Sequence, residues 1–359
     1  MIKYIGSKRR LVPVLGELAA TVGARTALDL FTGTTRVAQE LKRLGMHVTA
    51  VDSARYAEMF ARCYVESDAT EIDHHAVDAA LRDLARRPGV DGYVTETFCV
   101  QSRFFQPFNG RRIDAVRDAI ESDYCDSPLY PVLLTSLIEA ADRVDSTTGV
   151  QMAYVKQWAP RSFRPLELRA SELLPGPGRA VRGDACDLVG TAGSFDFAYL
   201  DPPYNQHRYF TNYHIWETLV AWDAPVHYGV ACKRVDARGP ETRSPFNERA
   251  RMPDALERVI RDVDAAVVAV SYNDESWVTI DELEAMVAAR GGAVCTLAFE
   301  SRRYVGAQIG IHNPQGKKVG KVSHLRNVEY VVVGGDPAAM RAVADRFEAS
   351  VARPNLEPA

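Results

Sequence analysis

The sequence predicts an α/β fold that is interrupted by an inserted helical domain. Residues 27–31 and 47–52 are short, apolar and strand-like, and a helical pattern covers residues 36–44 between them, so together they form a β-α-β unit. The strand pattern is absent from about residue 66 to residue 178, where helical periodicity replaces it. Strand-like segments return after residue 178, which places the helical stretch inside an α/β domain.

The composition is that of an ordinary globular protein. Of the 359 residues, 47% are hydrophobic and 25% are charged, and 43 Lys and Arg stand against 47 Asp and Glu. This length favours about two domains. The formal net charge of −4 does not indicate a nucleic-acid-binding protein, so the distribution of charge along the chain matters more than its sum.

The chain shows no signal for secretion, a membrane or a metal. It starts with a basic segment that lacks a secretory apolar region, and no apolar run has the length of a membrane span. The six cysteines are scattered without a C-x-x-C pair, and the eight histidines show no ligand spacing. We therefore expect a reduced, cytoplasmic protein with no metal and no membrane association.

The first β-α-β unit has features of a nucleotide-binding fold. A basic start that contains Tyr4 and Lys8 leads into a helix after residue 11, although Lys8 alone could equally be an exposed surface lysine. The turn after Phe31 contains a single glycine, Gly33, and Asp52 follows 19 residues later at a strand end. An acid at that position suits hydrogen bonds to ribose hydroxyls. No Walker lysine follows the turn, which favours a cofactor with adenosine and without phosphates.

The helical stretch contains two segments that interleave cations with aromatic rings. Helices are expected over residues 76–86, 113–120 and 129–144, and the two mixed segments are residues 101–112 and 156–169. Cations can contact phosphates, and rings can stack on bases or insert between them. Helix packing with solvated arginines explains these segments equally well.

The second half of the chain resumes the sheet and contains two basic loops. Strands are expected over residues 180–184, 196–200, 265–272, 294–299 and 328–333, and helices over residues 210–219 and 280–289. Residues 233–251 read as a long basic loop. Residues 301–327 contain six Lys or Arg, two His and no acid, which is typical of a nucleic-acid-facing loop or of a solvated flexible one. A short polar helix and a tail are expected over residues 336–359.

The most informative stretch is Asp201-Pro202-Pro203-Tyr204, which follows the apolar residues 197–200. The prolines must end the strand, which leaves Asp201 and Tyr204 at its carboxyl end, where open α/β sheets bind ligands. A carboxylate beside proline carbonyls can accept hydrogen bonds from both protons of an amino group, while a tyrosine stacks on the attached ring. This arrangement suits an exocyclic amine of a nucleobase, although an Asp-Pro-Pro turn on its own is usually only a turn.

Taken together, these segments resemble the DNA N6-adenine methyltransferases with an Asp-Pro-Pro-Tyr motif, which include Dam-type enzymes and many modification methylases. The resemblance runs from residue 3 to about residue 334. It implies a Rossmann-like S-adenosylmethionine-dependent methyltransferase sheet with an inserted target-recognition domain. The expected division is a first catalytic part over residues 1–65, the helical target-recognition insertion over 66–178, a second catalytic part over 179–335 with basic loops 233–251 and 301–327, and a C-terminal helix and tail over 336–359.

The resemblance also implies roles for individual residues. The implied catalytic residues are Asp201, Pro202, Pro203 and Tyr204. The implied cofactor contacts are Tyr4, Lys8, Asp29, Phe31, Gly33, Asp52, Asp184 and Asp201, with Asp52 on the ribose and Asp184 on the adenine amino group of the cofactor. The expected DNA contacts are Arg103, Arg111, Arg112, Lys317, Lys318, Lys321 and Arg326. The chain departs from the family pattern at Tyr4, where many relatives have tryptophan, and in the turn at Gly33, where they often have two glycines.

The function that follows is methyl transfer from S-adenosylmethionine to N6 of an adenine flipped out of double-stranded DNA, in a restriction-modification or genome-marking role. A cognate restriction endonuclease is a further expected partner. An RNA adenine-N6 methyltransferase and a catalytically silent DNA-binding module remain as alternatives. A cytosine-N4 enzyme more often has Ser, and a glutamine or protein methyltransferase more often has Asn, in place of Asp201. The missing second and third glycines argue against a dehydrogenase.

Overall fold

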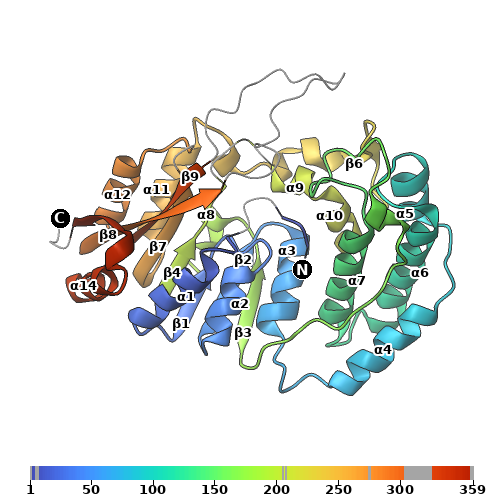
Figure 1. The fold of residues 1–359 in the computed structure, drawn as a ribbon, viewed down its shortest axis with the longest axis horizontal. Coiled ribbons are helices and arrows are strands. Elements are labelled where there is room, and N and C mark those ends of the chain that lie inside the picture. Colours follow the sequence, from blue (N-terminus) through green and yellow to red (C-terminus); the bar gives the residue numbers. More distant parts are fainter. Residues whose placement is uncertain are drawn as a thin grey trace. The chain divides into compact units, whose positions relative to one another are not determined.

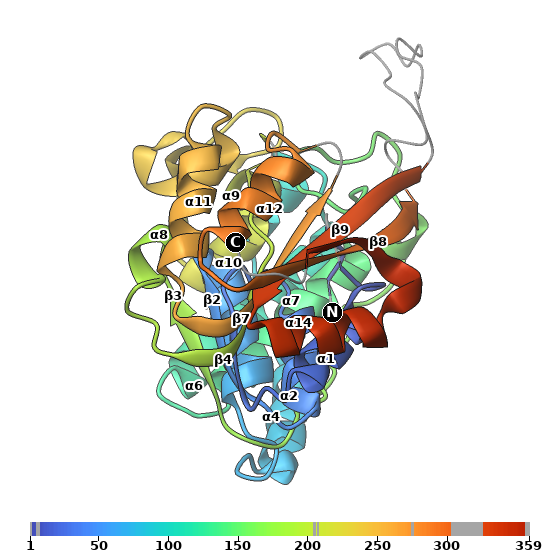
Figure 2. The same cartoon turned by 90° about the vertical axis from the view of Figure 1, so that its left-hand side faces the viewer.

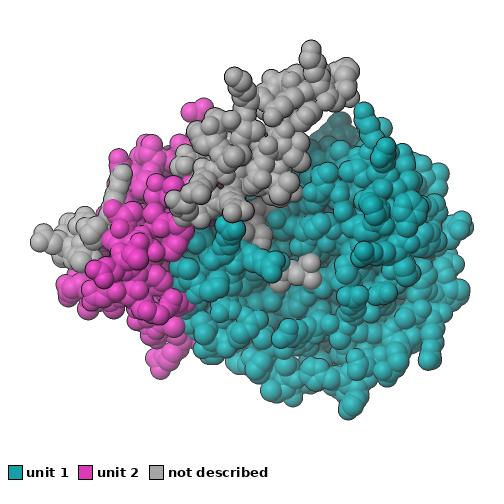
Figure 3. All heavy atoms as spheres, viewed as in Figure 1, with its two compact units in different colours: residues 1–16, 31–185, 207–244 teal, residues 17–30, 186–206, 245–359 magenta. Residues whose placement is uncertain are grey.

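The computed structural model describes residues 2–4, 8–203, 206, 208–273, 276–302 and 326–355. The chain divides into two compact units, shown in different colours in Figure 3. Unit 1 comprises residues 1–16, 31–185 and 207–244, and unit 2 comprises residues 17–30, 186–206 and 245–359. In the described part of the chain, eight strands belong to the main sheet, so the fold is α/β as predicted.

Unit 1 contains two parallel strands of this sheet, β2 (His47–Asp52) and β3 (Gly178–Arg182), paired from Val48 opposite Gly178 to Asp52 opposite Arg182. Helix α2 (Arg36–Arg43) precedes β2, and α3 (Arg55–Ala61) follows it and continues as a π-helical turn, Arg62–Glu66. Both helices pack against β2. The predicted β-α-β order is confirmed, and the predicted strand over residues 47–52 has the observed bounds.

The helical insertion is also part of unit 1. Its elements are α4 (His74–Arg86), α5 (Tyr93–Thr95), the π-helical turn Glu96–Val100, α6 (Pro107–Tyr124), α7 (Tyr130–Val144) and the 3-10 turn Pro160–Phe163. Helices α4, α6 and α7 contact one another, as Figure 1 shows. No strand occurs in the described residues between β2 and β3, which confirms the predicted loss of the sheet pattern.

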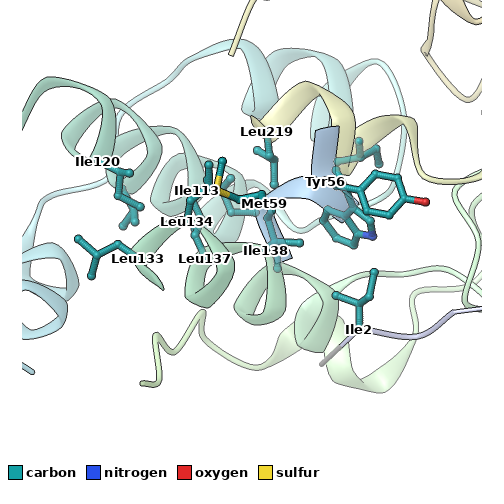
Figure 4. Packing of buried hydrophobic residues seen from close by; sticks show 14 of the residues in the cluster. Ile2, Tyr56, Met59, Ile113, Ile120, Leu133, Leu134, Leu137, Ile138 and Leu219 are labelled. Carbon is teal, nitrogen blue, oxygen red and sulfur yellow. The ribbon is translucent and has the colours of Figure 1, made fainter. Parts of the chain in front are cut away.

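The core of unit 1 joins the insertion to residues from other parts of that unit. Figure 4 shows Ile2 and Tyr56 in the same buried cluster as Leu137 and Ile138 of α7. Ile2 is only 3% exposed, and burying a side chain of this size contributes roughly 1.5–3 kcal/mol. The N-terminal residues are therefore anchored in the core.

The end of unit 1 differs from the long basic loop that we predicted over residues 233–251. Helices α9 (Tyr209–Asn212) and α10 (His214–Ala221) are followed by a small hairpin, β5 (His227–Tyr228) and β6 (Lys233–Arg234), and by the 3-10 turns Val235–Arg238 and Pro240–Thr242. Arg234 is 5% exposed and lies 2.7 Å from Asp223 and 2.6 Å from Asp236. Its charge is therefore compensated inside the protein, so the prediction of a basic loop is wrong at this residue.

Unit 2 contains the other six strands, in the order β10 (Val351–Asn355), β8 (Ala293–Arg302), β9 (Arg326–Gly335), β7 (Ala265–Asn273), β4 (Phe195–Leu200) and β1 (Thr26–Asp29). Strands β1, β4 and β7 are parallel, whereas β7, β9, β8 and β10 pair antiparallel. The predicted tail after residue 346 is wrong in part, because residues 351–355 form strand β10 against β8.

The helices of unit 2 cover its part of the sheet. They are α11 (Met252–Asp262), α12 (Ile280–Ala288) and α14 (Pro337–Arg346), seen in Figure 2, with the short α8 (Ala185–Leu188) and α1 (Val12–Thr21) at the unit boundaries. A Cβ built at Gly334 meets Val287 of α12, and one built at Gly335 meets Met340 of α14. Since successive strand residues face opposite sides, α12 and α14 cover opposite faces of β9. Among the described residues, no helix has the length and hydropathy needed to span a membrane.

Candidate active site

Two acids that the sequence predicted separately lie at one edge of unit 1. Asp52 ends β2 and stands opposite Arg182, the last residue of β3. The backbone N–H of Gly183 donates to the carbonyl of Asp52 over 3.0 Å. Asp184, the next residue, is half-buried and precedes α8. The carboxyl ends of parallel strands thus bring Asp52 and Asp184 together, as expected for a ligand-binding edge.

The turn after Phe31 holds the carboxylate of Asp52 in place. Gly33 has a φ of +50°, a conformation that glycine adopts without strain. Its N–H donates to Oδ2 of Asp52 over 2.9 Å, and the N–H of Ala54 donates to Oδ1, also over 2.9 Å. Burial raises the pKa of Asp52, while these backbone hydrogen bonds oppose the rise. These N–H groups fix the orientation of the carboxylate, and its remaining lone-pair capacity suits donors such as ribose hydroxyls.

Tyr4 lies directly over this turn. A Cβ built at Gly33 lies 3.2 Å from the hydroxyl of Tyr4, and that hydroxyl is 3.2 Å from the hydroxyl of Tyr56. The ring of Tyr4 stacks on Tyr213 at 4.7 Å and on Tyr209 at 5.3 Å between centroids. Burial raises the pKa of Tyr4 well above 10, so the phenol is neutral at physiological pH. Tyr4 therefore joins the glycine turn to α9 and to Tyr213, the residue before α10.

Two further predicted cofactor contacts, Lys8 and Phe31, also belong to unit 1. Lys8 is 8% exposed, so it is not the exposed surface lysine that the sequence also allowed. Its carbonyl accepts hydrogen bonds from the N–H groups of Leu11 and Val12 at the start of α1. Phe31 is half-buried, and the N–H of the next residue, Thr32, bonds to the carbonyl of Val51 in β2.

Unit 2 holds the predicted catalytic residues that the structure describes. Strand β4 ends at the fully buried Leu200, as the prolines predicted, and Asp201 and Pro203 are half-buried. In the neighbouring parallel strand β1, the buried Asp29 stands opposite Tyr199. Asp29 and Asp201 thus lie near the carboxyl ends of adjacent strands. Tyr204 lies outside the described residues.

Gln151 is a structurally important residue that the sequence did not reveal. It belongs to the helical insertion, and its side-chain carbonyl accepts a hydrogen bond of 2.8 Å from the N–H of Ile215 in α10. Its backbone carbonyl lies 3.0 Å from Nε2 of His214. Burial lowers the pKa of His214 to about 3, so the ring is neutral and Nε2 donates. The insertion thereby holds the start of α10, the helix beside Tyr4.

The three predicted DNA contacts in the insertion have different partners in the structure. The guanidinium of Arg103 lies 4.7 Å from the centre of the Trp158 ring and donates to the carbonyl of Lys156 over 2.9 Å. Arg111 pairs with Asp91 at 2.6 Å. Arg112 donates to the carbonyl of Ala85 near the end of α4, over 2.7 Å.

The other predicted DNA contacts follow β8. Lys317, Lys318 and Lys321 lie outside the described residues, and Arg326 is the first residue of β9. Within the described residues, no group of three or more His, Cys, Asp or Glu is arranged to hold a metal ion.

Comparison with known proteins identifies a family whose model matches this sequence. The model of the D12 class N6 adenine-specific DNA methyltransferases matches residues 4–286. Type II methyltransferase M.NlaIII of Neisseria lactamica is 28% identical over 318 residues, which are 84% of this chain and 92% of that protein. Modification methylase StsI of Streptococcus sanguinis is 27% identical over 300 residues, 79% of this chain and 45% of its own.

Two further comparisons are weaker. Modification methylase LlaI of Lactococcus lactis is 25% identical over 306 residues, 79% of this chain and 48% of its own, so the chain spans about half of the StsI and LlaI methylases. A solved putative O-methyltransferase from Nostoc punctiforme aligns with a TM-score of 0.28 and 8% identity over 90% of this chain and 56% of that one.

Proposed function

Because this chain belongs to the D12 class of N6 adenine-specific DNA methyltransferases, we propose that it takes a methyl group from S-adenosylmethionine and transfers it to N6 of an adenine flipped out of duplex DNA. The observation that carries this proposal is the position of Asp201 and Pro202 directly after the buried end of β4. A carboxylate and a carbonyl at a strand end can both accept hydrogen bonds from one amino group.

Such contacts suit the chemistry of adenine. The lone pair of N6 is delocalised into the ring, so the amine is a poor nucleophile. Hydrogen bonds from its two N–H groups to Asp201 and to the carbonyl of Pro202 favour a tetrahedral nitrogen and localise the lone pair. In this proposal Tyr204 stacks on the adenine ring. As the new N–C bond forms, the C–S bond of the cofactor would break and leave a neutral thioether, and the nitrogen would then lose one proton to water, which restores the neutral amine.

The cofactor side of the proposal rests on unit 1. Bound S-adenosylmethionine supplies a methyl group on positively charged sulfur, which an amine can attack directly. The fixed carboxylate of Asp52 suits its ribose hydroxyls, and Asp184 at the same edge suits its adenine amino group. In-line transfer then needs positioning and electrostatics rather than a covalent enzyme intermediate.

The DNA side of the proposal rests on the insertion, residues 66–178, as the target-recognition domain. Residues 97–113 and 146–166 contain no acid, and side chains join them: Arg103 lies against Trp158, and Asn109 donates to the carbonyl of Arg164 over 2.9 Å. Phe163 is 61% exposed beside Arg164. Arg111 and Arg161 in these segments pair with Asp91 and Asp145, whereas the exposed Phe163 and Arg164 suit a base and a phosphate. Flipping the adenine costs a few kcal/mol, which such contacts help to offset.

The names of the relatives support a proposal about the biological role. The relatives are named type II methyltransferases and modification methylases, so we propose that this chain modifies DNA in a restriction-modification or genome-marking role, with a cognate restriction endonuclease as partner. An RNA adenine-N6 methyltransferase and a silent DNA-binding module are the alternatives.

Transfer of labelled methyl from S-adenosylmethionine to unmethylated duplex DNA and to structured RNA tests the proposal, with both products digested to nucleosides. We expect N6-methyladenine in the DNA, loss of label with Asp201→Ala, and full activity with Asp187→Ala, which removes an exposed carboxylate nearby in the chain. If label appeared only in RNA, the substrate would be RNA rather than DNA. Retained activity in Asp201→Ala would overturn the mechanism.

A further inference from the structure

Two buried carboxylates of unit 1 form ion pairs with side chains from two segments that are far apart in the chain. Asp142 of α7 and Asp145 just after it have side chains that are 7% and 3% exposed. Nζ of Lys3 lies 2.9 Å from Oδ2 of Asp142 and 3.3 Å from Oδ1 of Asp145. From the insertion, Nη2 of Arg161 lies 2.6 Å and Nε lies 3.0 Å from the same Oδ1 of Asp145. Asp145 is therefore shared by Lys3 and Arg161.

On one side, this cluster fixes the segment that carries Tyr4. The backbone N–H of Lys3 donates to Oδ2 of Asp142 over 3.1 Å, and its Nζ also donates to the carbonyl of Asp142. Ile2 is buried just before it. Residues 2–4 belong to no helix or strand, so these contacts, with the ring contacts of Tyr4, hold the segment over the Gly33 turn.

On the other side, the cluster fixes the 3-10 turn Pro160–Phe163. Besides its contact with Asp145, Arg161 donates to the carbonyl of Thr147 over 2.5 Å. Asn109 of α6 holds the same turn through the carbonyl of Ser162 at 3.2 Å. The turn presents Phe163 and the exposed Arg164, which stand at the proposed DNA surface.

We propose that Asp145 is a positioning residue for both substrates: it holds Tyr4 at the cofactor site through Lys3, and it holds the DNA-facing turn through Arg161. The proposal rests on the proposed function, since it assigns the two sides to cofactor and DNA. Its physical basis is that a buried carboxylate is costly when unpaired, so each cation is held firmly. The carboxylates are buried while the side chains of Lys3 and Arg161 are 35% and 31% exposed, so salt screens these pairs less than pairs between two exposed side chains.

The contacts of Asp145 with Lys3 and with Arg161 predict separate effects on the binding of cofactor and of DNA. We expect Lys3→Ala to weaken binding of S-adenosylmethionine about tenfold and to leave DNA affinity unchanged. We expect Arg161→Ala to weaken DNA binding about tenfold and to leave cofactor affinity unchanged. Asp145→Asn, which keeps the shape and removes the charge, should weaken both. Lys3→Arg keeps the cation and should restore most of the cofactor affinity.

The test measures each ligand alone on the full chain, with S-adenosylmethionine by calorimetry without DNA and fluorescent duplex DNA by anisotropy without cofactor. Arg143→Ala is the matched control, because Arg143 lies on α7 and pairs with Glu139 at 3.9 Å. An unchanged cofactor affinity in Lys3→Ala, or an unchanged DNA affinity in Arg161→Ala, overturns the proposal. So does an equal loss of both affinities in each single variant, which indicates a general effect on folding.

These outcomes are distinct from a failure of the proposed function. If the unaltered chain binds no S-adenosylmethionine, the proposed function fails and the inference fails with it. If the unaltered chain binds both ligands and the variants bind them equally well, only the inference fails. Should Asp145→Asn not fold, Lys3→Ala and Arg161→Ala still decide the matter, with Lys3→Arg as the rescue.

Discussion

The carboxylate of Glu217 accepts a hydrogen bond of 3.3 Å from the backbone N–H of Tyr56. Tyr56 lies in the first turn of α3, and Ala54 at its N-cap supplies no side-chain hydrogen bond. Glu217 comes from α10, so one helix of unit 1 satisfies an open donor of another. Because Asp52 lies just before this turn, Glu217 also stabilises the loop that carries the proposed ribose contact.

Glu217 gives a prediction about pH. It is 1% exposed, and burial raises its pKa from 4.5 to about 7, although Tyr56, Arg234 and Arg55 oppose the rise. The folded state therefore binds this proton more tightly than the unfolded state does. The stabilisation is complete below about pH 4.5 and is lost as the pH rises to about 7. At about 1.4 kcal/mol per pKa unit, the loss is at most ~3.5 kcal/mol.

Glu217→Gln keeps an oxygen that accepts from Tyr56 and removes the titration. Urea unfolding at about pH 5 and about pH 8 should show the unaltered chain losing stability relative to this variant. Glu172→Gln, which changes an exposed carboxylate, is the control. Parallel pH curves for the unaltered chain and Glu217→Gln would contradict this account.

The glycine turn gives a second prediction. Gly33 and Gly45 both have positive φ values, +50° and +86°, so alanine at either position costs roughly 1–2 kcal/mol of stability. Only at Gly33 does the new methyl group meet Tyr4, because nothing lies within 4 Å of a Cβ at Gly45. We therefore expect Gly33→Ala to weaken S-adenosylmethionine binding in calorimetry and Gly45→Ala to leave it intact. Equal affinities of the two variants for S-adenosylmethionine would mean that Tyr4 is not part of the cofactor site.

The DNA surface gives a third prediction. Arg164 is exposed next to Phe163, whereas Arg112 donates to carbonyls near the end of α4. Each phosphate contact adds about 0.9 to the slope of log affinity against log salt. Arg164→Ala should lower the slope by about 1, while Arg112→Ala and the exposed control Arg82→Ala should not change it. A lower slope in Arg112→Ala would instead support the sequence-based prediction that Arg112 contacts DNA.

Much of the fold and part of the site could be predicted from the sequence. Residues 265–270 are a continuous apolar run, and residues 48–51 are apolar except for Thr49; such segments form buried strands, here β7 and β2. Asp52 and Asp184 each follow a strand-like segment, and parallel strands bring their carboxyl ends to one edge. Local pattern and this general rule were sufficient at these positions.

Other residues depend on partners far away in the chain. Glu217 and Tyr56 are 161 residues apart, and Lys3 and Asp142 are 139 apart, so no local pattern joins them. Strand β10 was missed for a related reason. Its sequence, VARPN, contains a proline and an arginine, which disfavour a central strand, but β10 pairs only with β8 at the sheet edge, where a missing N–H is tolerated.

The buried Arg234 gives the last prediction. It pairs with Asp223 and Asp236, whereas Arg238 is exposed and lies 3.7 Å over the ring of Tyr228. Arg234→Ala removes a buried side chain and its ion pairs with two partly exposed carboxylates, so we expect a loss of about 2 kcal/mol in urea unfolding. Arg238→Ala should cost less than about 1 kcal/mol.

A measurement of DNA binding distinguishes this structural role from the role of a basic loop that the sequence of residues 233–251 suggested. Because the charge of Arg234 is compensated by Asp223 and Asp236, Arg234→Ala should leave the salt dependence of DNA affinity unchanged at a temperature where the variant is folded. A lower salt slope combined with full stability would mean that Arg234 leaves its two partners to bind phosphate. Loss of stability with an unchanged slope would place Arg234 in the scaffold that supports α10, since it lies 3.5 Å from the hydroxyl of Thr218 in that helix.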